Sequence, residues 1–221
     1  MNSFSAKAFL FDLNGTMIDD MHFHLRVWHA ILNDDLSAGL SLEEVRRQMY
    51  GKNHELLERV FGTGALTLDE ADRISRLKEE RYQEMYRPHM KLLPGLSDFL
   101  ENAYRKKIPM AIGSAAIPFN IDFVLDTLQI RHFFKAIVSA DDVVNSKPDP
   151  ETFLKAASLL GVDASECLVF EDAPKGVEAA ERAGMSAIAV TTLHKAGEFG
   201  HLSNILMFVA DYTDPRFSGF F

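Results

Sequence analysis

Cysteine and long apolar runs are scarce in this sequence, and each scarcity excludes a class of protein. The 221 residues include a single cysteine, Cys167, so the chain can form neither an intramolecular disulfide nor a site with several thiolate ligands. We therefore expect a reducing compartment, the cytoplasm. No apolar run approaches the ~20 residues that a membrane helix requires, so we expect no association with a membrane.

Positive charge is also scarce. The chain has 23 lysines and arginines against 32 aspartates and glutamates, which gives a formal net charge of −9. Since nucleic-acid binding needs cations to neutralise phosphates, and no basic stripe is present, we expect no nucleic-acid partner. The first 15 residues have no cationic segment before their apolar stretch, so we expect no signal peptide. The default expectation is a soluble monomer.

Short apolar runs that end at a polar or small residue recur along the chain. They predict buried parallel strands, because such strands are covered on both faces and lose the polar alternation of an exposed strand. The expected strands are residues 8–11, 110–112, 136–138, 168–170 and 187–190. Helical patterns over 149–160 and 174–183 lie between the later strands and stop at Gly161 and Gly184. This alternation predicts an α/β fold with a doubly wound parallel sheet.

One long stretch interrupts the alternation. Residues 21–91 are helix-like throughout, with 40–60 and 68–86 rich in Glu, Arg, Leu and Met. We interpret this stretch as an all-helical cap domain, 18–92, inserted into a core domain made of 1–17 and 93–221. The two junctions between the domains are candidate hinges.

Polar side chains follow several of the expected strands. Asp12 follows the first strand, Ser114 follows the second, Glu171 and Asp172 follow a later one, and Lys147 lies in a loop after another. Each of them alone is readily explained as a turn, a helix cap or a solvated cation. Because ligands bind beyond the carboxyl ends of parallel strands, their convergence on one edge predicts a functional site instead.

Phosphoryl transfer is the chemistry that suits this set of residues. Three carboxylates at one edge repel each other unless a hard divalent cation lies among them, and oxygen ligands with few protein donors favour Mg²⁺. A carboxylate can attack phosphorus as a nucleophile. A hydroxyl and an ammonium can then hold the other phosphoryl oxygens and offset their charge. We therefore expect a Mg²⁺-dependent enzyme that acts on a small phosphorylated metabolite.

Four segments resemble, in order and spacing, the four motifs of the haloacid dehalogenase superfamily. They are residues 11–16 (FDLNGT), 113–115 (GSA), 146–150 (SKPDP) and 170–180 (FEDAPKGVEAA). The sequence is most similar to the β-phosphoglucomutase-like phosphatases, whose helical cap is inserted after the first motif. The resemblance implies a Rossmann-like core and catalysis through an aspartyl-phosphate.

The resemblance also implies a role for each matching residue. Asp12 corresponds to the nucleophile, and Thr16 to a residue that orients the catalytic loop by hydrogen bonding. The implied metal ligands are Asp12, the backbone carbonyl of Asn14, Glu171 and Asp172. The residues implied to bind the transferring phosphoryl group are Ser114, Ala115 and Lys147.

Asn14 departs from the family pattern. Phosphatases and mutases of the family carry at this position an Asp that protonates the leaving oxygen and later activates water. An amide cannot exchange a proton near neutral pH, so acid–base catalysis worth ~10²- to 10⁴-fold is missing there. We expect Mg²⁺ and phosphate binding to persist while turnover of poor leaving groups is slow. Asp19, Asp20, His22 and His24 are alternative acids, and an engineered Asp-to-Asn change is another explanation.

Two cap residues match positions that the mutases use. His24 corresponds to a histidine that couples cap closure to catalysis, although a helix in which His24, Val27 and Trp28 simply pack explains it equally well. Lys78 corresponds to a cap lysine of the mutases. On a helix rich in Glu and Arg, an ion-paired surface lysine is the favoured interpretation.

The segment around Gly51 favours a phosphatase over a mutase. The mutases carry a Lys before this glycine and an Arg three residues after it, and both hold the distal phosphate of the sugar. Tyr50 and His54 occupy these places here, which weakens a distal-phosphate clamp. The candidate substrate-binding residues of the segment are Gly51, Lys52 and His54.

Other functions remain as alternatives. A β-phosphoglucomutase-type mutase shares all four motifs. Haloacid dehalogenation needs no Mg²⁺ and leaves Glu171 and Asp172 unexplained. Phosphonoacetaldehyde hydrolysis tolerates Asn14 but needs a cap lysine that forms a Schiff base, and Lys52 lies in the right region. Asn14 alone supports a phosphate-metabolite binding protein that has lost catalysis.

Overall fold

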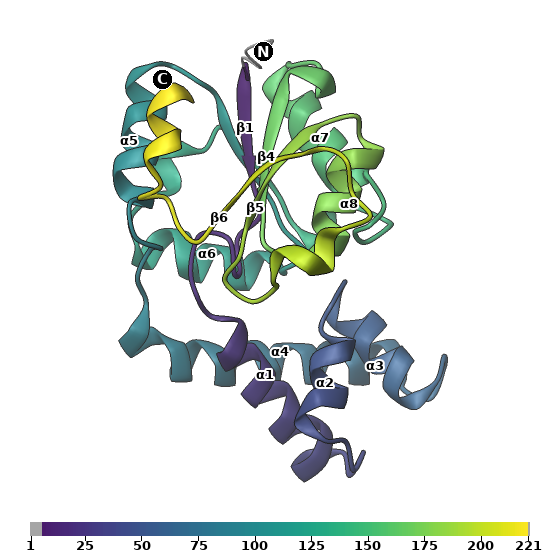
Figure 1. The fold of residues 1–221 in the computed structure, drawn as a ribbon. Helices are drawn as coiled ribbons and strands as arrows, with labels where there is room; N and C mark the ends of the chain where they lie inside the picture. The colour runs from purple at the N-terminus through teal and green to yellow at the C-terminus, as the bar shows by residue number, and fades with distance from the viewer. Residues whose placement is uncertain (1–5, 221) are drawn as a thin grey trace. The chain divides into compact units, whose positions relative to one another are not determined.

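The computed structural model describes residues 6–220 and divides the chain into two compact units. We call the first the α/β unit; it combines the chain up to Asp19 with Lys91–Phe221. The second, the helical unit, is Asp20–Met90. Residues 1–5 and residue 221 lie outside the described residues. The expectation of no signal peptide concerns the first 15 residues, so it falls partly outside them. Figure 1 shows the chain passing from β1 into α1 and returning from α4 to α5.

The α/β unit contains a parallel sheet of six strands among the described residues, in the order β3-β2-β1-β4-β5-β6. The strands are β1 (Ala8–Phe11), β2 (Met110–Gly113), β3 (Ala136–Val138), β4 (Cys167–Glu171), β5 (Ser186–Val190) and β6 (Ile205–Val209). The order runs outward from β1 in both directions, so β1 and β4 flank the point where the winding reverses. The predicted doubly wound α/β fold is therefore confirmed, and its ligand edge lies at the carboxyl ends of these strands.

Strand β1 illustrates why apolar runs form the sheet. Its residues alternate between two buried faces, so no position can be polar. Phe9 and Phe11 face an aromatic layer and both contact Phe170, at ring-centroid distances of 5.6 and 4.5 Å. Leu10 lies on the opposite face, in a hydrophobic cluster that is mainly aliphatic and also includes Phe153. All five predicted strands are present. The sixth, β6, was not predicted, since it is an edge strand and only partly buried.

Helices cover both faces of the sheet. They are α5 (Leu96–Arg105), α6 (Pro118–Thr127), α7 (Glu151–Leu160) and α8 (Pro174–Arg182). Helix α5 places Phe99 against Phe9 on the aromatic face, and α7 and α8 cover the opposite face (Figure 1). Helix α7 ends where Gly161 adopts the left-handed conformation, with φ of 69°. Its buried side is formed by Phe153, Ala156 and Ala157, whereas Leu154 is exposed.

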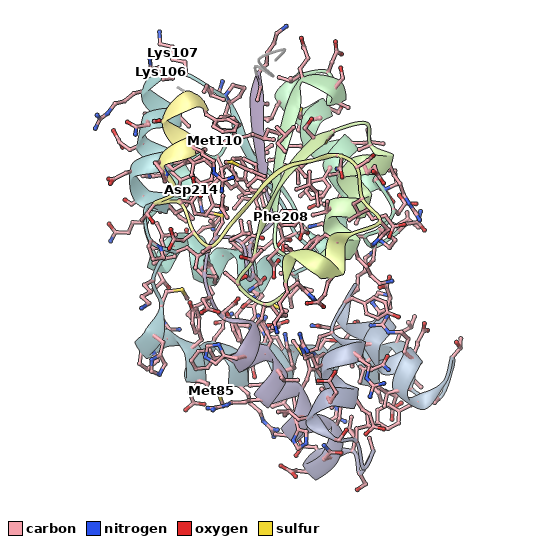
Figure 2. The ribbon with its side chains drawn as sticks, in the orientation of Figure 1. Met85, Lys106, Lys107, Met110, Phe208 and Asp214 are labelled. Atoms are coloured by element: carbon pink, nitrogen blue, oxygen red, sulfur yellow. The ribbon has the colours of Figure 1, made fainter. Side chains whose placement is uncertain are left out.

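The connection from α5 to β2 is short and basic. Arg105 ends the helix, and Lys106 and Lys107 follow it (Figure 2). Three cations thus lie near the helix C-terminus, where the macrodipole favours positive charge. Lys107 turns the chain with φ of 59°, and β2 begins at Met110.

The last described segment docks on the core. Residues Pro215–Phe220 form a 3₁₀ turn, and Phe217 is buried within it. The Phe217 ring contacts Phe99 and Tyr212, at centroid distances of 5.1 and 5.5 Å.

The helical unit is built from four α-helices among its described residues. They are α1 (Met21–Ala30), followed by a π-helical turn (Ile31–Asp35), then α2 (Leu42–Gln48), α3 (Asn53–Phe61) and α4 (Leu68–Tyr86). Ser41 with Glu44 and Thr67 with Glu70 form capping boxes that start α2 and α4. The predicted stretch 40–60 is divided near Gly51, where φ is 71°. No described helix combines the length and the apolar character needed to cross a bilayer.

Candidate active site

Asp12 lies one residue beyond the end of β1. Its backbone N–H donates to the carbonyl of Phe170 at 3.0 Å, so hydrogen bonding to β4 fixes the position of the Asp12 backbone, from which the side chain extends. The chain then turns sharply through Gly15, whose φ is 80°. A Cβ on Gly15 would lie 2.1 Å from Asp172 Oδ2. Only glycine therefore permits both the turn and the close approach of the second carboxylate.

Lys147 joins two of the predicted acidic residues. Its ammonium donates to Asp12 Oδ1 at 2.7 Å, to Glu171 Oε1 at 2.9 Å and to the carbonyl of Gly113 at 2.9 Å. Burial alone would lower the pKa of Lys147, but the charges and hydrogen bonds of Asp12 and Glu171 outweigh it and raise the pKa above its ordinary value. The side chain is therefore a permanent cation beside Asp12. Its Nζ also lies 4.5 Å from the ring centroid of Phe153.

Glu171 and Asp172 mark the end of β4. Glu171 Oε2 accepts from the backbone N–H of Ala173 at 2.7 Å, and a Cβ on Gly176 would overlap the Glu171 carboxylate. The first turn of α8 can therefore approach this side chain only because residue 176 is glycine. Thr16 Oγ1 lies 3.2 Å from Asp172 Oδ1 and 3.4 Å from Asp12 Oδ2, so its hydroxyl can donate to either carboxylate.

These three carboxylates form a group that can hold a metal ion. One oxygen from each of Asp12, Glu171 and Asp172 lies within 4.8 Å of the others, and all three residues are buried. Three buried carboxylates carry more negative charge than the Lys147 ammonium can balance, so the group favours an added cation. A set of carboxylate oxygens suits a hard divalent ion. The residues present therefore fit a divalent metal.

Ser114 and Ala115 follow β2 at the same edge. Ser114 is buried; its backbone N–H donates to Val138 at 2.9 Å, and its Oγ accepts from Ala116 N–H at 3.2 Å. The hydroxyl therefore stabilises its own turn and does not cap α6, whose N-cap is Ile117. Gly113, the residue before Ser114, supplies the carbonyl that accepts from Lys147, so the backbone at the start of this turn lies beside the lysine.

Sequence reasoning missed two residues that support the catalytic loop. Thr192 Oγ1 donates to the carbonyl of Gly15 at 2.6 Å, and Tyr212 OH donates to the carbonyl of Thr16 at 3.1 Å. Burial, with a smaller contribution from Asp12 and Asp172, raises the pKa of Tyr212 well above its ordinary value, so it remains a phenol donor. Thr192 follows β5 and could have been found by its place at the ligand edge. Tyr212 follows β6, which was not predicted.

The helical unit brings two predicted residues together, and one expectation about them is wrong. Lys78 Nζ lies 2.7 Å from Nδ1 of His24 and 2.9 Å from Oε1 of Glu79. The lysine is only 3% exposed, so it is not an ion-paired surface residue as its helix pattern suggested. Its charge is tolerated inside the unit because Glu79, equally buried, neutralises it.

The remaining candidates in and near the helical unit are dispersed. Asp19 and His22 are exposed, whereas Asp20 is buried and accepts from Tyr82 OH at 2.5 Å. His54 is exposed on α3. The backbone N–H of Lys52 donates to the side chain of Glu55 at 3.0 Å, at the start of α3. Asn53, a residue that the sequence did not single out, donates to Glu79 Oε1 at 3.0 Å.

The α/β unit is a Rossmann-like core with a candidate divalent-metal site at the ligand edge of its sheet. A family model described as haloacid dehalogenase-like hydrolase matches residues 6–184. The chain therefore belongs to the haloacid dehalogenase-like hydrolases, and the resemblance stated from its four motifs is confirmed.

Named relatives and solved structures agree with this assignment. Fructose-1-phosphate phosphatase YqaB of Escherichia coli is 32% identical over 188 residues, which cover 83% of this chain and 96% of that protein. Beta-phosphoglucomutase of Bacillus subtilis is 31% identical over 191 residues, covering 83% of each. A haloacid dehalogenase hydrolase of family IA, variant 3, from Entamoeba histolytica superimposes with a TM-score of 0.82 at 26% identity, covering 94% of each chain.

Proposed function

We propose that this protein is a Mg²⁺-dependent phosphatase of small phosphorylated metabolites such as sugar phosphates. The observation that carries the proposal is the buried Asp12 carboxylate, which Lys147 holds at 2.7 Å beside the carboxylates of Glu171 and Asp172. A carboxylate fixed in this way is suited to attack phosphorus. The relatives named as phosphatases, among them fructose-1-phosphate phosphatase and hexitol phosphatase A of Escherichia coli, support this reaction class.

Asp12 acts as the nucleophile in the proposed reaction. One of its carboxylate oxygens forms a bond to phosphorus while the bond from phosphorus to the ester oxygen breaks, which leaves an aspartyl-phosphate and an alcohol. Water then releases inorganic phosphate and restores the carboxylate. Lys147 keeps Asp12 oriented and offsets the charge of the phosphoryl group, and Ser114 with the Ala115 backbone holds the other phosphoryl oxygens.

Asp12, Asp172 and the backbone carbonyl of Asn14 would hold Mg²⁺, with Glu171 beside them. When bound, the ion supplies electrostatic stabilisation of the negative phosphoryl oxygens. Glu171 already accepts from Lys147 and from a backbone N–H. We therefore assign Glu171 mainly the role of positioning Lys147.

Proton transfer is the weak step of the proposed reaction. The leaving oxygen needs a proton, and Asn14 follows Asp12 by two residues at the place where an acid is expected. Asp20 and His24 are alternative acids; both are buried, and Asp20 is engaged by Tyr82. We therefore expect esters with good leaving groups to turn over faster than sugar phosphates.

We further propose that residues 18–92 act as a cap that selects the substrate. The candidates for contact with the leaving group are His24, Gly51, Lys52, His54 and Lys78. Asn14 favours one second function, a binding protein for phosphorylated metabolites that has lost turnover.

A phosphate-release screen over phosphate esters tests the proposal. We expect Mg²⁺-dependent release from at least one small ester by this chain, and faster release by the Asn14→Asp variant. The Asp12→Asn variant controls for contaminating phosphatases and should release none. Tight binding of esters with no release by either the chain or the Asn14→Asp variant would favour the binding protein.

A further inference from the structure

A second group of buried charged side chains lies inside the helical unit. Helix α4 carries Lys78 and Glu79 on consecutive positions, and both are buried, at 3% and 2% exposure. Glu80, the next residue, is exposed and pairs with Arg76 on the helix surface. Since charged residues are rarely buried without a purpose or a partner, the contacts of this pair show what the group can bind.

Two neighbouring side chains accept hydrogen bonds from the Lys78 ammonium. It donates to Glu79 Oε1 at 2.9 Å and to His24 Nδ1 at 2.7 Å. It also lies 5.6 Å from the ring centroids of both Trp28 and Tyr82. The positive charge is therefore already compensated before any ligand arrives.

His24 links this pair to a second carboxylate. Because its Nδ1 accepts from Lys78, its Nε2 carries the proton and donates to Asp20 Oδ2 at 3.2 Å. The Tyr82 hydroxyl donates to the same oxygen at 2.5 Å. The group thus holds the carboxylates of Asp20 and Glu79 close to the ammonium of Lys78.

One oxygen of Glu79 has no hydrogen bond to any described residue. Oε1 accepts from Lys78 and from Asn53, whereas Oε2 is buried and accepts from none of residues 6–220. Burial alone would raise the pKa of Glu79, but the charge of Lys78 and the hydrogen bonds from Asn53 and Lys78 outweigh burial and lower the pKa below its ordinary value, so the carboxylate is ionised. A buried ionised oxygen without a donor is costly and favours a ligand that brings one.

We propose that Glu79 selects substrates with an uncharged, hydroxyl-bearing leaving group and disfavours a second phosphate. A hydroxyl supplies the donor that Oε2 lacks, whereas a phosphate dianion supplies only acceptors and is repelled by the ionised Glu79 carboxylate. The Asn53 amide is half-buried, and a ligand hydroxyl that displaces it reaches the carboxylate. This inference rests on the proposed phosphatase function and narrows its substrates to polyol or sugar monophosphates.

Two substrate pairs test the inference by phosphate release at saturating Mg²⁺. The first pair is glucose 1-phosphate and glucose 1,6-bisphosphate, and the second is glycerol 1-phosphate and propyl phosphate. For the unmodified chain we expect kcat/KM to favour the monophosphate and the hydroxylated ester, each by about tenfold or more. Equal kcat/KM values within each pair would overturn the inference.

The Glu79→Gln variant keeps the side-chain volume and removes the charge. We expect both preferences to fall at least fivefold, mainly through KM. Glu80→Gln is the matched control, since it removes the same charge one residue away on the exposed surface, and it should leave both ratios unchanged. Identical ratios in the two variants would overturn the inference.

The outcomes separate the inference from the proposed function. Release of phosphate with no preference within either pair contradicts the inference alone. No release from any ester, by this chain or by the Asn14→Asp variant, contradicts the proposed function and the inference with it. If the Glu79→Gln variant does not fold, the preferences of the unmodified chain decide.

Discussion

The two buried lysines of this protein have similar partners and opposite surroundings. Lys147, in the α/β unit, and Lys78, in the helical unit, each donate to a buried glutamate. Around Lys147, three carboxylates from the ends of β1 and β4 converge within 4.8 Å. Around Lys78, the second carboxylate is reached only through His24. The first arrangement concentrates negative charge in one place and fits a metal ion. The second distributes its charges over hydrogen bonds between neighbouring side chains.

The residues of the two groups also differ in how they are distributed along the sequence. Asp12, Lys147 and Asp172 are far apart in the chain, and the parallel sheet brings them to one edge. The residues around Lys78 come mostly from α1 and α4, where helical spacing places them on facing sides. A catalytic site assembled by a sheet is therefore recognisable as motifs at strand ends. A polar group inside a helical unit has no comparable pattern in the sequence.

The largest expected effect concerns the missing acid beside Asp12. The Asn14→Asp change supplies a proton donor at the leaving oxygen, so we expect kcat for sugar phosphates to rise by about 10²- to 10⁴-fold. Steady-state phosphate release measures it. For an ester with a good leaving group the increase should be much smaller, and equal increases for both kinds of ester would contradict the assigned role.

Replacing each lysine by methionine sharpens the comparison between the two groups. Lys147→Met leaves Asp12 and Glu171 buried without their cation, so we expect a loss of about 3–5 kcal/mol in the free energy of unfolding. Saturating Mg²⁺ should restore part of this loss, because the ion balances the same carboxylates. Chemical denaturation with and without Mg²⁺ measures both effects.

Lys78→Met is the counterpart in the helical unit. It should also lower the free energy of unfolding, since Glu79 loses its partner. Mg²⁺ should restore none of that loss. Equal recovery of the two variants by Mg²⁺ would contradict the distinction between the carboxylate group around Lys147 and the charged group around Lys78.

A pair of glycines tests how closely the catalytic loop approaches Asp172. Gly15→Ala adds a Cβ at 2.1 Å from Asp172 Oδ2 and also strains a φ of 80°. We expect a loss of about 1–3 kcal/mol in unfolding free energy and weaker Mg²⁺ binding. Gly39→Ala has a similar φ of 68° but no atom within 4 Å of the new Cβ. It should show the backbone strain alone, with Mg²⁺ affinity unchanged in a calorimetric titration.

The smallest expected effect is the difference in unfolding free energy between variants of a buried glutamate and an exposed glutamate on α4. Glu79→Gln should lower the free energy of unfolding by about 1–3 kcal/mol, because Lys78 loses its charge partner. Glu80→Gln removes a surface ion pair with Arg76 and should change it by about 0.5 kcal/mol or less. Thermal unfolding of the two variants in parallel measures the difference. Equal midpoints would contradict the charge balance assigned to the buried group.

The sequence predicted most of the α/β unit because its signals are local. Buried strands need continuous apolar runs, and phosphate and metal ligands need polar residues at their ends, so Asp12, Ser114, Lys147 and Asp172 were recognisable. Edge strand β6 was not predicted because a partly buried strand resembles other apolar segments. Tyr212, which follows β6, was missed for the same reason. Lys78 was misjudged because its helix is rich in charge, and the pattern alone does not show that a glutamate beside it is buried too.

The most direct test of the account is the covalent state of Asp12 during turnover. The chain is incubated with Mg²⁺ and acetyl phosphate, quenched in acid and digested, and the peptide that contains Asp12 is weighed by mass spectrometry. Acetyl phosphate has a good leaving group, so Asn14 should slow only the hydrolysis step and the adduct should accumulate. The account predicts one phosphoryl group on Asp12, removed by hydroxylamine and absent from the Asp12→Asn variant. Turnover of acetyl phosphate with an unmodified Asp12 peptide at every time point would contradict it.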